Sequence, residues 1–151
     1  MPTDQESLYQ ALVLMVRETR SRSIEAVIYL NYERMSAVAW AREHRTVRYA
    51  LGRRMGHTAM GVRLALETAT EQGLPSLYLV ASPAQRDEVQ ADVAGLGVVV
   101  FCFDELDFVA RYGGHVGLVV VDCATFFSPR KLKRLWGMSH DLGDPMFVLL
   151  Q

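Results

Sequence analysis

The sequence has very little lysine: Lys131 and Lys133 are the only two among its 16 basic residues, and the rest are arginine. The formal net charge is −1, which excludes a polybasic protein that coats nucleic acid through bulk charge. Cysteine is also scarce. Cys102 and Cys123 each lie in an apolar run without a zinc-binding pattern, so we expect two buried thiols in a reducing cytoplasm.

Long apolar runs and a basic-then-apolar leader are absent as well. No run approaches the roughly 18 residues of a membrane helix, so we expect a cytoplasmic protein. What is present is a hydrophobic fraction of 50% in 151 residues, enough to bury the core of one domain. The sequence pattern changes near residue 45, which predicts an N-terminal helical extension over 1–45 and an α/β core over 46–151.

The N-terminal segment carries helical signals. A capping-box pattern at Thr3 and Glu6 predicts a first helix, which we expect to end at residues 21–23. Apolar residues at helical spacing predict a second, longer helix over 24–39, although residues 27–30 also fit a strand. We expect these helices to cover one face of a sheet, to mediate self-association, or to bind a protein partner.

The core shows short apolar runs that alternate with helical segments. The predicted strands are 47–51, 77–81, 98–103, 118–121 and 146–150, and the predicted helices are 59–72, 83–94, 104–112 and 129–136. The run over 98–103 does not alternate, so we expect that strand to be buried on both faces. This alternation predicts a mostly parallel five-stranded sheet with helices on both faces, whose ligand binds beyond the carboxyl ends of the strands.

The turn after the first strand has the composition of an anion site. It contains Gly52, Arg53, Arg54, Met55, Gly56, His57 and Thr58, and Ala59 continues into a helix. Glycines let backbone N–H groups point inward, and a helix N-terminus favours negative charge. Asp122 follows a buried apolar strand, and an acid there would face the same crevice, where with Thr58 it could hold magnesium.

These motifs resemble those of P-loop NTPases. The stretch 51–58 is similar to the phosphate-binding loop, with Leu51 at the first glycine and His57 at the lysine. The stretch 117–122 is similar to a Walker B motif, with Cys123 where a glutamate usually follows. The order of elements over 46–151 resembles the first RecA-like lobe of helicase- and terminase-like ATPases, with Gln151 placed like a sensor residue. The stretch 122–129 resembles the Asp-x-Ala-x-Phe-x-Ser-Pro pattern of small phage-type ATP-binding proteins, which would place the protein in a host cytoplasm.

The resemblance implies a protein that binds ATP or ADP with Mg²⁺ and hydrolyses it slowly or not at all. Backbone N–H groups of 54–58 would hold the β-phosphate, Thr58 and the catalytic Asp122 the metal, and His57 or Arg53 would replace the lysine. The alternative is a non-enzymatic interaction module on a decayed P-loop fold that binds a protein or nucleic acid. Besides the N-terminal helices, its candidate contacts are Arg130, Lys131, Lys133 and Arg134.

Overall fold

The computed structural model describes residues 4–29, 35–50 and 56–151. Five strands form one sheet in the order β1-β5-β4-β2-β3, and every neighbouring pair is parallel. The strands are β1 (Thr46–Tyr49), β2 (Ser76–Val80), β3 (Val98–Cys102), β4 (Leu118–Val121) and β5 (Met146–Leu150). The expected α/β class is therefore confirmed, and the architecture is consistent with a RecA-like α/β core.

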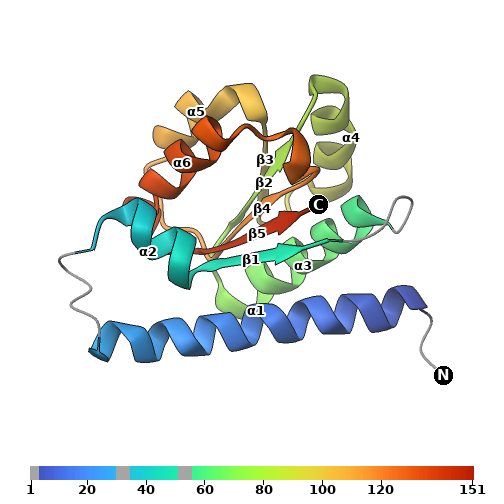
Figure 1. Cartoon of the computed structure of the whole chain (residues 1–151). Helices are drawn as coiled ribbons and strands as arrows, with labels where there is room; N and C mark the ends of the chain where they lie inside the picture. The colour runs from blue at the N-terminus through green and yellow to red at the C-terminus, as the bar shows by residue number, and fades with distance from the viewer. Residues whose placement is uncertain (1–3, 30–34, 51–55) are drawn as a thin grey trace.

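Helices cover both faces of the sheet (Figure 1). One face carries α1 (Asp4–Tyr29), α3 (His57–Gln72) and α4 (Pro83–Val93), and the other carries α2 (Ala37–His44), α5 (Leu106–Ala110) and α6 (Pro129–Gly137). Short 3-10 turns, η2 (Phe103–Glu105) and η3 (Ala124–Phe126), follow β3 and β4. No described helix, the 26-residue α1 included, combines the length and the hydropathy of a membrane span.

The central strands are apolar along their whole length because both faces are covered. In β4, Leu118 and Val120 pack in the core beneath α1, α3 and α4, whereas Val119 and Val121 pack in the core beneath α2, α5 and α6. The prediction that 98–103 is buried on both faces is wrong. β3 is an edge strand, and Val99 and Phe101 on its second face are only partly buried.

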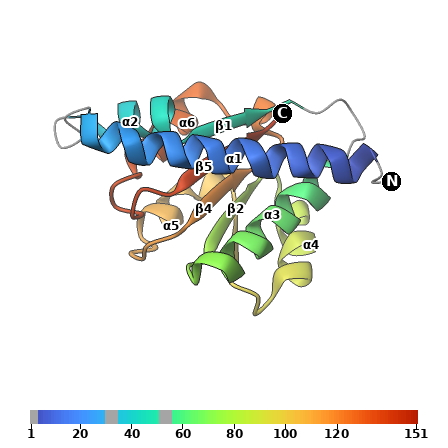
Figure 2. The same ribbon diagram turned by 90° about the horizontal axis from the view of Figure 1, so that it is seen from below.

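α1 packs lengthwise against the sheet instead of standing apart from it (Figure 2). Tyr9, Leu12 and Val16 are buried in the same core as the inward side chains of β1, β4 and β5. At the edge of the sheet, the Tyr49 hydroxyl donates a hydrogen bond of 2.7 Å to the Leu8 carbonyl. Part of one helical layer therefore comes from the segment that the sequence marks as an extension.

The predicted helix end at residues 21–23 is wrong, because α1 continues to Tyr29. Ser23 is buried, and its hydroxyl donates to the Arg20 carbonyl at 2.7 Å and accepts from Arg45 Nη1 at 2.6 Å. A serine whose hydroxyl bonds back to its own helix is tolerated in the interior. The serine that the sequence indicates as a helix breaker is thus a contact between α1 and the start of β1.

The predicted helix over 24–39 and the alternative strand over 27–30 are wrong for the same reason. Residues 24–29 belong to α1, and Leu30 lies outside the described residues. A separate helix, α2, begins after Ser36, whose hydroxyl accepts a hydrogen bond from the Ala39 amide at 3.1 Å. This serine cap sets the start of α2, as side-chain caps commonly do.

The chain reverses its direction across the sheet between β2 and β4. After β2 it crosses through α4 to β3 at one edge, and after β4 it crosses through α6 to β5 towards the other edge. The two crossover helices lie on opposite faces of the sheet. Such a switch point leaves a crevice at the carboxyl ends of the two strands, where α/β proteins bind their ligands.

We predict that Leu12→Ala lowers the free energy of unfolding by about 2–5 kcal/mol, because the side chain is fully buried against the sheet. Leu14→Ala is the matched control on the same helix, since the Leu14 side chain is 57% exposed, and it should change stability by less than about 0.5 kcal/mol. Urea unfolding measures both. Equal effects of the two substitutions would contradict the packing of α1.

Candidate functional site

The structure brings Thr58 and Asp122 together at the carboxyl ends of the strands. Side chains alternate along β4, so Asp122 points to the same face as Val120, which is the face covered by α3. Thr58 lies in the first turn of α3. Its hydroxyl donates a hydrogen bond of 2.7 Å to Asp122 Oδ2, across 64 residues of sequence.

The Asp122 carboxylate is fully buried, and its two oxygens differ sharply. Oδ2 also accepts from the Tyr78 hydroxyl at 2.9 Å and from Gln85 Nε2 at 3.2 Å. Oδ1 has no hydrogen-bond partner among the described residues. A buried polar atom without a partner costs free energy, so Oδ1 is the atom at which a bound cation or water would be stabilised.

Tyr78 and Gln85 are site residues that the sequence analysis missed. Tyr78 lies in a run that predicts only a buried strand, and Gln85 lies in the first turn of α4. Burial, and next the Asp122 charge, raise the pKa of the Tyr78 hydroxyl, which therefore stays protonated and can donate. The alternation of side chains along β2 is the one sequence signal for Tyr78. It points to Asp122 only once β2 is known to lie beside β4.

The N-terminus of α3 has no side-chain cap from the part of the chain that the structure describes. Gly56, which precedes the helix, has φ 75° in the left-handed region that glycine favours. Serine hydroxyls cap α2, α4 and α6. The first N–H groups of a helix have no partner within the helix, so those of α3 are available to a phosphate beside Thr58.

His57 contacts the end of β5. Its Nε2 lies 2.8 Å from the Gln151 carbonyl oxygen, and because a carbonyl only accepts, Nε2 carries the hydrogen. The imidazole thus presents Nδ1 as its second polar atom. Gly52, Arg53, Arg54 and Met55 lie outside the described residues, and Ala59 is exposed in the first turn of α3.

Cys123 follows Asp122 in a left-handed conformation, with φ 53°. Burial, and next the Asp122 charge, raise the pKa of its thiol. The thiol is therefore held neutral at a position where the resemblance to P-loop NTPases would place a carboxylate. It cannot act as the base that a glutamate would be.

The basic residues of α6 lie on the other side of the sheet. Lys131 pairs with Asp104 at 2.6 Å, and Arg134 pairs with Asp107. Arg130 and Lys133 are exposed. Two of the four predicted nucleic-acid contacts are therefore already engaged by carboxylates from the segment after β3.

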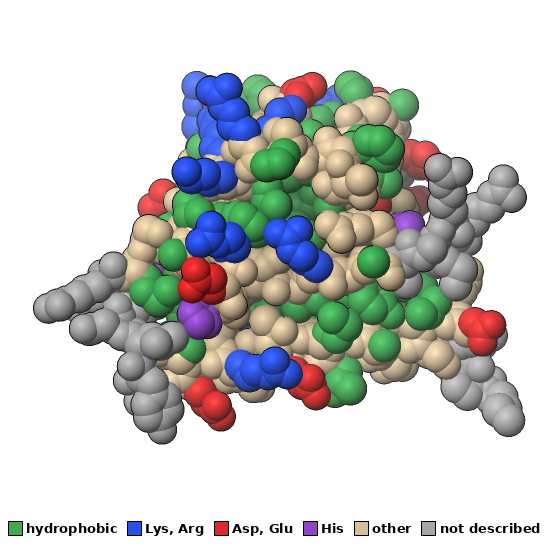
Figure 3. Space-filling model, viewed as in Figure 1, with side chains coloured by type: hydrophobic (Ala, Val, Ile, Leu, Met, Phe, Trp, Pro, Cys, Tyr) green, Lys and Arg blue, Asp and Glu red, His purple; other side chains and the backbone are tan. Residues whose placement is uncertain are grey.

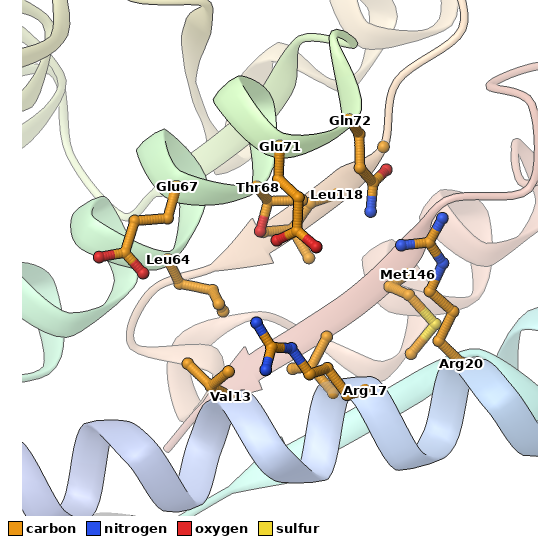
Figure 4. A pocket seen from close by; sticks show the side chains of 12 residues that line it. Val13, Arg17, Arg20, Leu64, Glu67, Thr68, Glu71, Gln72, Leu118 and Met146 are labelled. Atoms are coloured by element: carbon orange, nitrogen blue, oxygen red, sulfur yellow. The ribbon is translucent and has the colours of Figure 1, made fainter.

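A small cavity lies between α1 and α3, far from Asp122 (Figure 4). Arg17 and Arg20 of α1 line it together with Glu67 and Glu71 of α3, and Leu118 and Met146 mark the amino ends of their strands. Its volume is about 60 Å³, well below the roughly 300–1,000 Å³ of typical ligand pockets. Its charges balance, and it is too small for a nucleotide.

Magnesium suits the donor set at Asp122. The described residues contain no cluster of three or more His, Cys, Asp or Glu side chains of the kind that cages a metal ion. Mg²⁺ typically binds through one or two carboxylates and takes its other ligands from substrate phosphates and water. One buried carboxylate with an unpaired oxygen, beside a hydroxyl at a helix N-terminus, fits that requirement.

Comparisons with protein families, with curated proteins and with solved structures give no significant match for this chain.

We predict that Tyr78→Phe lowers the free energy of unfolding by roughly 1.5–3 kcal/mol, because it removes a buried hydrogen bond to a carboxylate. Tyr49→Phe is the control. It removes a hydrogen bond to a neutral carbonyl and should cost roughly 0.5–1.5 kcal/mol. Urea unfolding of both variants measures the difference, and a smaller effect for Tyr78 would show that Asp122 does not depend on it.

Proposed function

We propose that this protein binds a nucleoside di- or triphosphate together with Mg²⁺ at the N-terminus of α3. The observation that carries the proposal is the buried Asp122 carboxylate, whose Oδ1 lacks a partner among the described residues while Thr58 holds Oδ2. Adenine nucleotides are the first candidates, because the sequence resembles ATP-binding P-loop proteins in this region. The geometry itself favours a phosphate and a divalent cation.

Each group has one role in this proposal. Backbone N–H groups at the start of α3 bind the phosphate, with the helix dipole adding favourable potential. The Thr58 hydroxyl and Asp122 Oδ1 hold the metal side of the complex, and Tyr78 and Gln85 fix the carboxylate. Mg²⁺ bound there neutralises phosphate charge. Because His57 Nε2 donates to Gln151, Nδ1 can replace the P-loop lysine as a phosphate donor only when the imidazole carries a second proton.

The same geometry favours weak hydrolysis. The neutral Cys123 thiol supplies no carboxylate to orient an attacking water. Orienting the attacking water is one of the few tasks that the protein performs in phosphoryl transfer, so we infer a binding protein that turns over slowly.

We predict that millimolar Mg-ATP or Mg-ADP raises the melting temperature of the protein. A ligand at about 100 times its Kd adds roughly 2.7 kcal/mol of stability. Thr58→Val, which removes the hydroxyl from Asp122, should abolish most of the shift. Thr70→Val is the matched control on the same helix and should keep the shift, because Thr70 is exposed and its hydroxyl donates to the Leu66 carbonyl of its own helix.

The absence of any shift with ATP, ADP, GTP or GDP would contradict the proposal and favour the non-enzymatic interaction module. An equal shift in Thr58→Val and the wild type would place the nucleotide elsewhere. Repeating the melt with EDTA in place of Mg²⁺ separates metal-dependent binding from simple phosphate binding. The proposal requires the larger shift with Mg²⁺ present.

The proposed site also predicts slow turnover. We expect steady-state ATP hydrolysis by the isolated chain to stay below roughly 1 s⁻¹, the lower end of typical enzyme turnover. Cys123→Glu should raise the rate, because it places a carboxylate beside the Asp122 site, while Cys102→Ser at the end of β3 serves as the control. Phosphate release measures both. Fast hydrolysis by the wild type would overturn the inference of a slow enzyme.

A further inference from the structure

A larger cavity opens on the α2 and α6 face of the sheet, at the same carboxyl edge as Asp122. Its volume is about 380 Å³, within the range of ligand pockets. Its lining is largely apolar, with two aromatic side chains and two arginines. The lining includes Arg42, Arg48, Thr125, Phe127, Pro129 and Trp136.

The charge of the lining is positive. Arg48, whose guanidinium carbon lies 5.7 Å from the Trp136 ring centroid, forms no ion pair among the described residues, whereas Arg42 pairs with the exposed Glu43 at 3.3 Å. No acidic side chain of the described chain lines the cavity. Lys133 follows the lining residue Pro129 by four positions on α6, so it borders the same helix face.

An aromatic side chain stands exposed beside this cavity. Phe126 of η3 is 78% exposed, the highest value among the large hydrophobic residues described. Its neighbours Thr125 and Phe127 line the cavity. In the space-filling view, Lys and Arg side chains border a hollow with apolar side chains at its bottom (Figure 3).

We propose that this cavity binds single-stranded nucleic acid. An unpaired base enters beside Phe127 and Trp136, a neighbouring base stacks on Phe126, and Arg42 and Arg48 hold the flanking phosphates. Base stacking on aromatic side chains beside a basic groove is the general physical basis of single-strand binding. The proposal is independent of the nucleotide site, because none of the residues that bond to Asp122 lines this cavity.

The shape and the charge favour a single strand over other anions. A base in a duplex is stacked and paired, so it cannot enter a concave pocket or stack on Phe126. A run of Asp or Glu side chains would pair with the arginines but would bring no ring to stack on Phe126. The cations also come from three elements, α2, β1 and α6, as a run of several phosphates would require.

Fluorescence anisotropy tests the proposal on the full chain. The probes are labelled oligothymidylate and oligouridylate of about 12 nucleotides, within the roughly 4–16 nucleotides that comparable sites cover, and a duplex of equal length. We expect DNA or RNA single strands to bind more tightly than the duplex. Arg48→Ala should weaken binding about tenfold and reduce the salt dependence by about one phosphate contact, a slope change of roughly 0.7.

Phe126→Ala should weaken binding about tenfold without lowering the melting temperature, because the side chain is exposed. Arg22→Ala, which removes an exposed arginine of α1 on the other side of the sheet, is the matched control and should leave affinity unchanged. Thr58→Val should also keep oligonucleotide binding, so this proposal and the nucleotide proposal can fail separately.

Three results would overturn the proposal. The first is no oligonucleotide binding by the wild type at low salt. The second is an affinity of Arg48→Ala and Phe126→Ala equal to that of Arg22→Ala. The third is binding of the duplex or of polyglutamate as tight as that of the single strands, which would show a non-specific anion surface.

Discussion

The buried Asp122 carboxylate is the group on which the arrangement of the site depends. A buried charge is tolerated only when its oxygens find donors. Here the donors come from the starts of two helices and from the middle of β2, through Thr58, Gln85 and Tyr78. All three bond to Oδ2, so the carboxylate ties α3, β2 and α4 to the end of β4 while one oxygen remains for a further ligand.

Both candidate sites lie at the carboxyl edge of the sheet, one on each face. The Asp122 site lies on the α3 face, and the aromatic cavity lies on the α6 face. Two short connections join them: the chain from Asp122 through the left-handed Cys123 to Ala124, and the hydrogen bond between His57 and Gln151. The two candidate sites are therefore neighbours in the fold, although they share none of the residues that bond to Asp122.

Much of the fold could be predicted because strands covered on both faces are continuous apolar runs, as in 118–121 and 146–150. The bounds of the N-terminal helices could not be predicted. The hydroxyl of Ser23 bonds to its own helix and to Arg45, and the second contact exists only after folding. The proximity of Thr58 and Asp122 could be predicted, because a loop after one strand and an acid after another both lie at the carboxyl edge of a parallel sheet. Tyr78 depends on β2 lying beside β4, which no local pattern contains.

Gly61 shows how packing sets the geometry of the site. A Cβ at Gly61 would lie 2.5 Å from the Tyr78 hydroxyl oxygen and 2.8 Å from Leu150 Cδ1, so only glycine lets α3 approach the sheet this closely. Thr58 is three residues earlier on the same helix, and its 2.7 Å bond to Asp122 requires that approach. A side chain at residue 61 would force the ends of the Tyr78 and Leu150 side chains to shift or α3 to move away, and either change would disturb the Tyr78 and Thr58 hydroxyls beside Asp122. The close packing of α3 on the sheet and the geometry of the candidate binding site therefore both depend on the absence of a side chain at residue 61.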